Sequence, residues 1–221
     1  MALWLHVHGG YPSYAGSGEG WNGTDYDAMK LVKALKGKSF GGYATLQTPS
    51  GQWVTFRETD RGPAFRIFGE WAVAKLREIG LTEGVLIPVP SSTCLAFGTD
   101  AKGRALADAI AQRTKGFSVE DAFHWKEDLG KAAEGGSRDP SVLQANLVLK
   151  GGPPSTVVLV DDVATSGGHL LACARALRAA GHTVEHAICA AQTVNNHPSN
   201  MWAIPAKDLE ADLFESLTLD F

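Results

Sequence analysis

The segment from Val157 to His169 constrains the fold of this chain more than any other part of the sequence. It begins with an uninterrupted apolar run, Val157 to Val160, and continues through a short polar turn into a helix expected from about Gly168 to Ala180. A continuous apolar strand of this kind is typical of a parallel sheet that is covered on both faces. The sequence therefore predicts a buried strand within an α/β domain.

Strands and helices alternate on both sides of this segment. Further strands are expected at Leu3–Val7, Val85–Ile87 and Val184–Ala191. Helices are expected from about Tyr26 to Leu35, from Pro63 to Ile79 and from Lys102 to Arg113. Asp25 is expected to cap the first helix, and two alternating stretches around residues 48–51 predict an antiparallel hairpin. This alternation indicates the α/β class, with right-handed crossovers and a parallel sheet.

The composition describes a globular chain and argues against several function classes. Hydrophobic residues make up 44% of the 221 residues and charged residues 20%, which suits a folded domain rather than a disordered chain. A net charge of −4 without a Lys/Arg run disfavours nucleic-acid binding. Three cysteines without a CxxC pair favour neither disulfides nor a zinc site, so a cytoplasmic location is expected. No signal peptide or membrane-spanning segment is expected.

Two adjacent carboxylates, Asp161 and Asp162, follow the apolar run directly. They are expected at the carboxyl end of a buried parallel strand, which is the edge where open α/β sheets bind ligands. Two like charges side by side are costly there unless a cation or hydrogen-bond donors satisfy them. A vicinal diol, with or without a divalent metal ion, would do so.

The turn that follows has the composition of a phosphate site. Thr165 and Ser166 offer hydroxyl groups, and Gly167 and Gly168 let backbone N–H groups approach a ligand closely. The N-terminus of the next helix adds a partial positive charge. A site for a diol or metal thus lies one short turn from a site for a phosphate, which matches the span of a ribose 5-phosphate.

This segment resembles the phosphoribosyl-pyrophosphate motif of type I phosphoribosyltransferases, which has four apolar residues, two acidic residues and a small, hydroxyl-rich turn. The resemblance implies that Asp161 and Asp162 hold the ribose hydroxyls and Mg²⁺. One position departs from the family pattern, because His169 stands where Thr or Ser is usual. The phosphate-binding residues that the resemblance implies are Ala164, Thr165, Ser166, Gly167, Gly168 and His169.

Two further stretches extend the resemblance over about residues 84–192. Ile87 to Ser92 resembles the strand and pyrophosphate loop of the competence-protein-F type, an amidophosphoribosyltransferase-like group, with Ser91 and Ser92 as contacts. The polar stretch from Trp125 to Ala145 is expected to be a long mobile loop and takes the place of the family's catalytic loop. Three basic residues of this stretch could close over the leaving group: Lys126, Lys131 and Arg138. The catalytic residues that the resemblance implies are Asp161, Asp162, Lys126 and Arg138.

The expected architecture is a Rossmann-like, parallel-sheet phosphoribosyltransferase-type core over residues 81–194. Residues 1–80, with their helices and hairpin, would form the hood over the acceptor, and residues 195–221 a tail. The resemblance implies a Mg²⁺-dependent transfer of phosphoribose from phosphoribosyl pyrophosphate to a nitrogenous acceptor in nucleotide metabolism. Its partners would be small-molecule substrates, and a homodimer is compatible with this interpretation.

Two alternatives stay open at this point. One is a non-catalytic module that binds phosphoribosyl pyrophosphate and regulates or assembles with partners. The other is an unrelated α/β protein whose Asp pair binds a metal ion for hydrolysis. Several other features are interpreted as structural: His6 and His8 as a half-buried strand, and Trp53 and Trp71 as packing residues.

Overall fold

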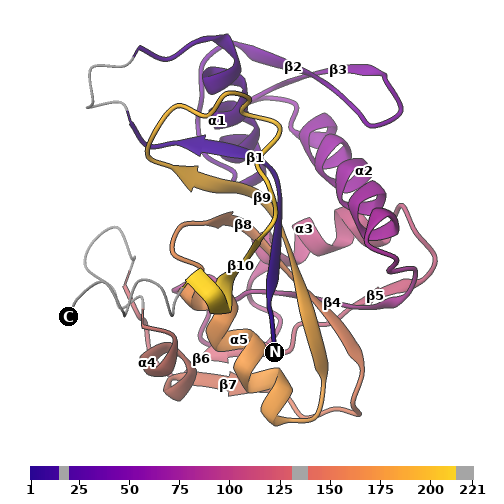
Figure 1. Ribbon diagram of the computed structural model, residues 1–221, viewed down its shortest axis with the longest axis vertical. Helices are drawn as coiled ribbons and strands as arrows, with labels where there is room; N and C mark the ends of the chain where they lie inside the picture. Colours follow the sequence, from indigo (N-terminus) through magenta and orange to yellow (C-terminus); the bar gives the residue numbers. More distant parts are fainter. Residues whose placement is uncertain (15–19, 131–138, 213–221) are drawn as a thin grey trace.

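The computed structural model describes residues 1–14, 20–130 and 139–212. Its main element is a six-stranded sheet with the strand order β10-β1-β9-β8-β4-β5 (Figure 1). β10 runs antiparallel to β1, and all other neighbours in the sheet pair in parallel. The expected α/β class with a mainly parallel sheet is therefore confirmed. The strands are β1 (Trp4–Pro12), β4 (Gly84–Pro88), β5 (Phe117–Val119), β8 (Thr156–Ala164), β9 (Thr183–Val194) and β10 (Lys207–Asp208).

The two faces of this sheet bury separate hydrophobic cores. Along β8, Val157 and Leu159 belong to the core shared with α5, whereas Val158 and Val160 belong to the core shared with α1, α2 and α3. These four side chains are at most 1% exposed, which explains why the run contains no polar residue. The helices are α1 (Gly23–Leu35), α2 (Gly62–Glu78), α3 (Ala101–Ala111) and α5 (Gly168–Ala179).

The expected hairpin is confirmed as β2 (Tyr43–Gln47) and β3 (Trp53–Arg57). Alternate residues of both strands, among them Leu46 and Phe56, are buried in the core that also contains α2. The hairpin therefore packs on the same face of the molecule as α1 and α2 (Figure 1).

The cap of α1 differs from the expected one. Asn22, not Asp25, is the N-cap, and its side-chain oxygen accepts hydrogen bonds from the backbone N–H groups of Thr24 and Asp25. Asp25 in turn accepts from the N–H of Asn22 at 2.8 Å, which completes a capping box. Both residues are good caps by type, so the sequence alone did not separate the two positions.

The expected loop from Trp125 to Ala145 is only partly a loop. Trp125 is fully buried and lies in β6 (Phe123–Trp125), which pairs with β7 (Leu147–Leu149). The short helix α4 (Pro140–Ala145) follows the part that the structure leaves undescribed. The expectation was wrong here because two hydrophobic strand residues, Phe123 and Trp125, outweigh the polar sequence that follows them.

The regions assigned to a hood and a tail both contribute to the main sheet. β1 pairs with β9 and β10 pairs with β1, so residues near both ends of the described chain complete the sheet. The boundaries at residues 80 and 194 stay a prediction. No helix in the described ranges is long and apolar enough to cross a membrane.

Candidate functional site

The candidate site lies where neighbouring strands of the sheet are connected in opposite directions. From β4 the chain continues through α3 to β5 on one side, whereas β8 lies on the other side and leads on to β9. β4 ends at Pro88, opposite Val160, but β8 continues beside β9 to Ala164. Asp161 and Asp162 are thus the first residues of β8 beyond the end of β4, and not the last residues of the strand. Such a switch point is the usual place for a ligand in an open α/β sheet.

The Asp161 carboxyl forms no ion pair with a described residue, although the charge of nearby Lys36 lowers its pKa in part. Burial raises its pKa well above the ordinary value, and the neighbouring Asp162 adds to the effect. The backbone N–H of Asp162 donates to Asp161 Oδ1 at 2.7 Å and opposes part of this shift. A ligand hydroxyl or a cation at this position would remove the remaining penalty.

Asp162 has a partner that the sequence did not reveal. Lys36 Nζ lies 2.9 Å from Asp162 Oδ1, and the two side chains are 29% and 28% exposed. Lys36 is the C-cap residue of α1, so the N-terminal region reaches directly into the candidate site. No local pattern links these two residues, because the chain brings them together only through the packing of α1 against the sheet.

The expected phosphate turn lies at the start of α5. Gly167 is the N-cap of α5 with a φ of 78°, a conformation that favours glycine, and no side chain caps it. The nearest side-chain acceptor is Ser166 Oγ, 3.4 Å from the N–H of Gly168. Thr165 and Ser166 are exposed, and Thr165 Oγ1 lies 3.1 Å from Thr193 Oγ1 on β9. Backbone N–H groups and two hydroxyl groups therefore lie at this helix end, and their binding of a phosphate stays a prediction.

The turn is supported from behind by the segment after β10. A Cβ atom on Gly167 would lie 2.9 Å from Leu209 Cδ2, so Leu209 packs directly against the backbone of the turn. Leu209 is 2% exposed and belongs to the core shared with α5. Any larger residue at position 167 would disturb both the backbone and this contact.

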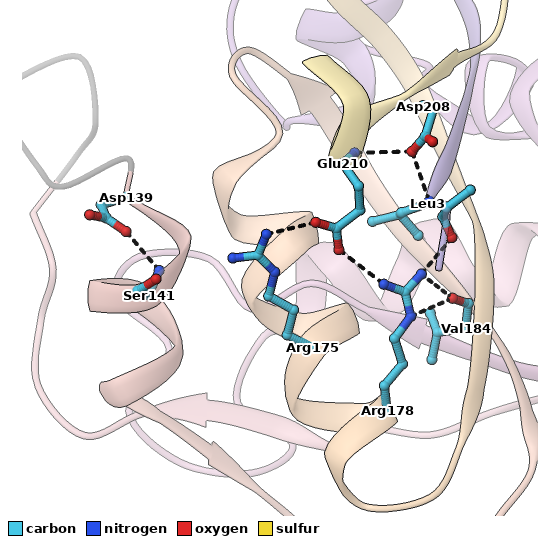
Figure 2. Close-up of polar contacts among 9 residues, drawn as sticks. Leu3, Asp139, Ser141, Arg175, Arg178, Val184, Asp208 and Glu210 are labelled. Atoms are coloured by element: carbon cyan, nitrogen blue, oxygen red, sulfur yellow. Dashed lines mark hydrogen bonds and ion pairs between the residues drawn. The ribbon is translucent and has the colours of Figure 1, made fainter. Parts of the chain in front are cut away.

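The two residues that flank Leu209 in the sequence, Asp208 and Glu210, belong to a charged cluster (Figure 2). Glu210 accepts from Arg175 Nη2 at 2.6 Å and from Arg178 Nη1 at 3.0 Å, and both arginines extend from α5. Asp208 Oδ1 accepts from the N–H groups of Leu3 at 3.1 Å and Glu210 at 3.0 Å. The cluster connects the start of β1, the segment after β10 and the helix whose N-terminus forms the phosphate turn.

His169 packs instead of presenting a hydroxyl. Its ring contacts Trp125 edge to face, with centroids 5.4 Å apart, and burial lowers the pKa of the imidazole. The indole N–H of Trp125 donates to the carbonyls of Pro90 at 3.2 Å and Ser91 at 2.9 Å. Trp125 therefore links the turn after β8 to the loop after β4. Its role was missed because it was placed in a mobile loop.

The loop after β4 is held by its own contacts. Ser91 is exposed and Ser92 half-buried, which leaves both beside the switch point. The N–H of Ser91 donates to Asp100 Oδ2 at 2.6 Å, and Asp100 also caps α3 through Gly103 at 3.1 Å. The loop is thereby fixed to the helix that follows it, and its expected contact with pyrophosphate stays a prediction.

Of the three basic residues expected to meet the leaving group, Lys126 alone lies within the described residues. Lys126 Nζ donates to the carbonyl of Ala145 at 2.5 Å, on α4. Arg104, at the start of α3, forms ion pairs of 3.0 Å with Asp108 and Asp121. The other two expected residues, Lys131 and Arg138, lie outside the described residues.

The residues present suit Mg²⁺ only together with a substrate. Within the described ranges no group of three or more His, Cys, Asp or Glu side chains is arranged to hold a metal ion. Mg²⁺ is commonly bound by one or two carboxylates together with substrate phosphates. Asp161 and Asp162 would provide the carboxylates, and a bound pyrophosphate the remaining oxygens.

The fold and the site define an α/β protein with an acidic pair and a glycine-capped helix N-terminus at a sheet switch point. No protein-family model matches the chain, and no curated protein matches it. Among solved structures, UMP synthase from Leishmania donovani is similar with 15% identity and a TM-score of 0.32. The match covers 72% of this chain and 29% of that enzyme's chain. What the site binds is therefore inferred from its own residues.

Proposed function

We propose that this chain is a Mg²⁺-dependent phosphoribosyltransferase of the type I class that resembles the competence-protein-F group by motif. It would transfer phosphoribose from phosphoribosyl pyrophosphate to a nitrogenous acceptor and release pyrophosphate. One observation carries the proposal: an unneutralised carboxyl, Asp161, and an uncapped helix N-terminus lie one turn apart at the switch point between β4 and β8.

The chain's own residues would position the donor at both ends of its ribose. Asp161 and Asp162 accept hydrogen bonds from the two ring hydroxyls, while the N–H groups at the start of α5 and the Thr165 and Ser166 hydroxyls bind the 5′-phosphate. With the sugar fixed at two points, the anomeric carbon is held toward the loop that contains Ser91. Positioning of this kind can contribute a large part of the rate acceleration.

The reaction breaks the bond between the anomeric carbon and the pyrophosphate oxygen and forms a bond to the acceptor nitrogen, which then loses a proton. Positive charge develops on the ribose ring as pyrophosphate leaves, and the two carboxylates beside the ring hydroxyls would stabilise it. Bound Mg²⁺ would neutralise the departing pyrophosphate.

The donor site is tested by titrating phosphoribosyl pyrophosphate calorimetrically, with and without Mg²⁺. The Asp161→Asn/Asp162→Asn variant should bind at least about 100-fold more weakly, because two charge-assisted interactions are lost. The matched control is Glu83→Gln/Glu185→Gln, which removes two exposed carboxylates near the amino ends of the strands and should bind normally. An absence of wild-type binding at millimolar ligand would reject the proposal.

The same site also supports a second candidate, a module that binds phosphoribosyl pyrophosphate without turning it over. Three contacts favour it: Lys126 is bonded to α4, Arg104 is paired on both sides, and His169 is packed against Trp125. Pyrophosphate release in the presence of ammonia, amines or nucleobases separates the two candidates. Normal donor binding without release under any of these conditions would select the module.

A further inference from the structure

A cavity separate from the candidate site lies on the sheet face opposite α5. Its volume is about 710 Å³, and it is bounded by α1, the β2–β3 hairpin and α2, with His8 of β1 and Trp202 completing its walls. None of its lining residues belongs to the acidic pair, the phosphate turn or the loop after β4. Cavities of this size take small organic ligands.

The inner wall of this cavity consists of aromatic rings that pack against one another and against β1. The His8 ring meets Trp71 and Trp202 edge to face, in both cases with centroids 5.2 Å apart. Phe68 stacks against Trp71 at 6.1 Å, which places a fully buried ring behind the wall. A Cβ atom on Gly9 would lie 2.8 Å from the Trp202 ring, so the glycine lets this indole lie directly on β1.

His8 contributes a polar group without a positive charge. The residue is 8% exposed, and burial lowers its pKa to about 4, which leaves the imidazole neutral near neutral pH. Its Nδ1 has no hydrogen-bond partner among the described residues. An unpartnered polar atom at a cavity wall of a folded protein is unusual and calls for an explanation.

The charges around the cavity leave one carboxylate in excess. Lys75 Nζ lies 2.7 Å from both carboxylate oxygens of Glu78, so these two residues neutralise each other. Asp27 on α1 makes no ion pair with a described residue; partial burial raises its pKa, and the charge of nearby Lys30 opposes part of this shift. The lining is therefore aromatic with a net negative charge at one side.

We propose that this cavity binds a flat aromatic compound that carries a protonated amino group. The Trp71 and Trp202 rings supply surfaces for an aromatic ring and for a cation, both of which favour tryptophan. The Asp27 carboxylate supplies the counter-charge. An anionic ligand would be repelled by the Asp27 carboxylate, while Lys75 is already paired with Glu78, so this site and the phosphate turn differ in the sign of the ligand that they select.

The test compares three probes that share one ring system and differ in the charge of the side chain. Tryptamine is the cation, tryptophol the neutral analogue and indole-3-propionate the anion, and their binding is measured by calorimetry and saturation-transfer NMR. Tryptamine should bind about fivefold to tenfold more tightly than tryptophol, as expected for one cation–π contact with a counter-ion. Indole-3-propionate should bind most weakly.

Two variants locate the site and one serves as control. Asp27→Asn should reduce tryptamine affinity to that of tryptophol and leave tryptophol affinity unchanged. Ala74→Phe, which fills the cavity from α2 without removing a core side chain, should abolish binding of both probes. Glu83→Gln removes an exposed carboxylate elsewhere and should change neither.

The proposal is overturned if all three probes bind equally, if none binds at millimolar concentration, or if tryptamine affinity is the same in wild type and Asp27→Asn. The thermal midpoint of each variant is measured alongside. If Ala74→Phe fails to fold, the Asp27→Asn comparison alone decides, because Asp27 lies at the side of the cavity and is not part of either core.

Discussion

Burial shifts pKa values in opposite directions at the candidate phosphoribosyl site and at the aromatic cavity. At the candidate phosphoribosyl site, adjacent carboxylates and backbone N–H groups suit a ligand that carries both hydroxyls and a phosphate. The pKa of Asp161 is raised there because burial opposes its charge. At the second, the pKa of His8 is lowered to about 4 by the same physical cause, and aromatic packing fixes the walls in advance.

This difference indicates that the first region contributes mainly to ligand binding and the second mainly to the stability of the fold. The phosphate turn and the acidic pair keep groups unsatisfied, so they reduce the stability of the ligand-free fold in return for affinity. The cavity wall belongs to the packing of α2 on the sheet, so changes there should alter stability first. The predictions below test this division, beginning with the largest effect.

The strongest expected effect concerns His8. Between pH 6.5 and about pH 4 the unfolded chain binds a proton at this residue and the folded chain does not, so stability falls as the pH falls through this window. His8→Phe keeps an aromatic ring between the two tryptophans. In this variant the fall in the free energy of unfolding over this pH range should be smaller by up to about 3 kcal/mol. Urea denaturation at about pH 7 and about pH 4 measures it.

His6, whose pKa is also lowered to about 4, leaves a residual pH dependence in the variant. Equal losses of stability in wild type and His8→Phe would show that His8 is protonated in the folded protein. The neutral wall assigned to the cavity would then be wrong. Binding of phosphoribosyl pyrophosphate should be unchanged in this variant.

The second effect concerns the cluster behind the phosphate turn. Glu210→Gln leaves Arg175 and Arg178 without their carboxylate and should lower the free energy of unfolding by about 2 to 3 kcal/mol. The control is Glu70→Gln on α2, which breaks a more exposed pair with Arg66 and should cost below about 0.5 kcal/mol. If both variants lose a similar amount of unfolding free energy, the cluster does not stabilise the turn.

The third change tests the turn itself. Gly167→Ala imposes a side chain at a φ of 78° and a contact with Leu209, and should cost about 1 to 2 kcal/mol of stability. Phosphoribosyl pyrophosphate should also bind about tenfold more weakly, since the N–H groups of the turn move. Gly151→Ala, at an open position without a positive φ, is the control. Unchanged donor affinity would argue against a phosphate at this helix end.

The smallest effect concerns Lys36. In the ligand-free protein it pairs with Asp162 and competes with any ligand for that carboxylate. Lys36→Met should therefore tighten Mg²⁺-dependent binding of phosphoribosyl pyrophosphate by up to about fivefold, the worth of a half-exposed ion pair. Lys38→Met, a nearby exposed lysine, should have no effect. Weaker binding in Lys36→Met would instead make this lysine a ligand contact.

Local patterns predicted much of the fold and the linear part of the site. The apolar run before Asp161 is uninterrupted because both sheet faces bury it, and the small residues after it form the turn at the start of α5. These features depend on neighbouring residues, so the sequence displays them directly. The α/β class, the hairpin and the helices followed from the same kind of pattern.

Contacts between distant segments could not be predicted in this way. The pairing of Lys36 with Asp162 depends on how α1 packs, and the central position of Trp125 depends on the β6–β7 pairing. His8 and Trp71 were interpreted as ordinary strand and packing residues, because nothing local shows that they share a cavity wall. Whether the acidic pair and the turn bind the expected donor stays a prediction.

The position of β1 has a consequence for how the chain folds. β1 lies between β9 and β10, so its first residues pair with partners about 180 positions away, as the 180-residue separation of the neighbouring His6 and His186 shows. Closing so large a loop is slow, and high contact order lowers folding rates. The apolar side of β1, with Leu5 and Val7, would remain uncovered while the rest of the chain is synthesised. A nascent chain of this topology should therefore depend on molecular chaperones until β9 emerges.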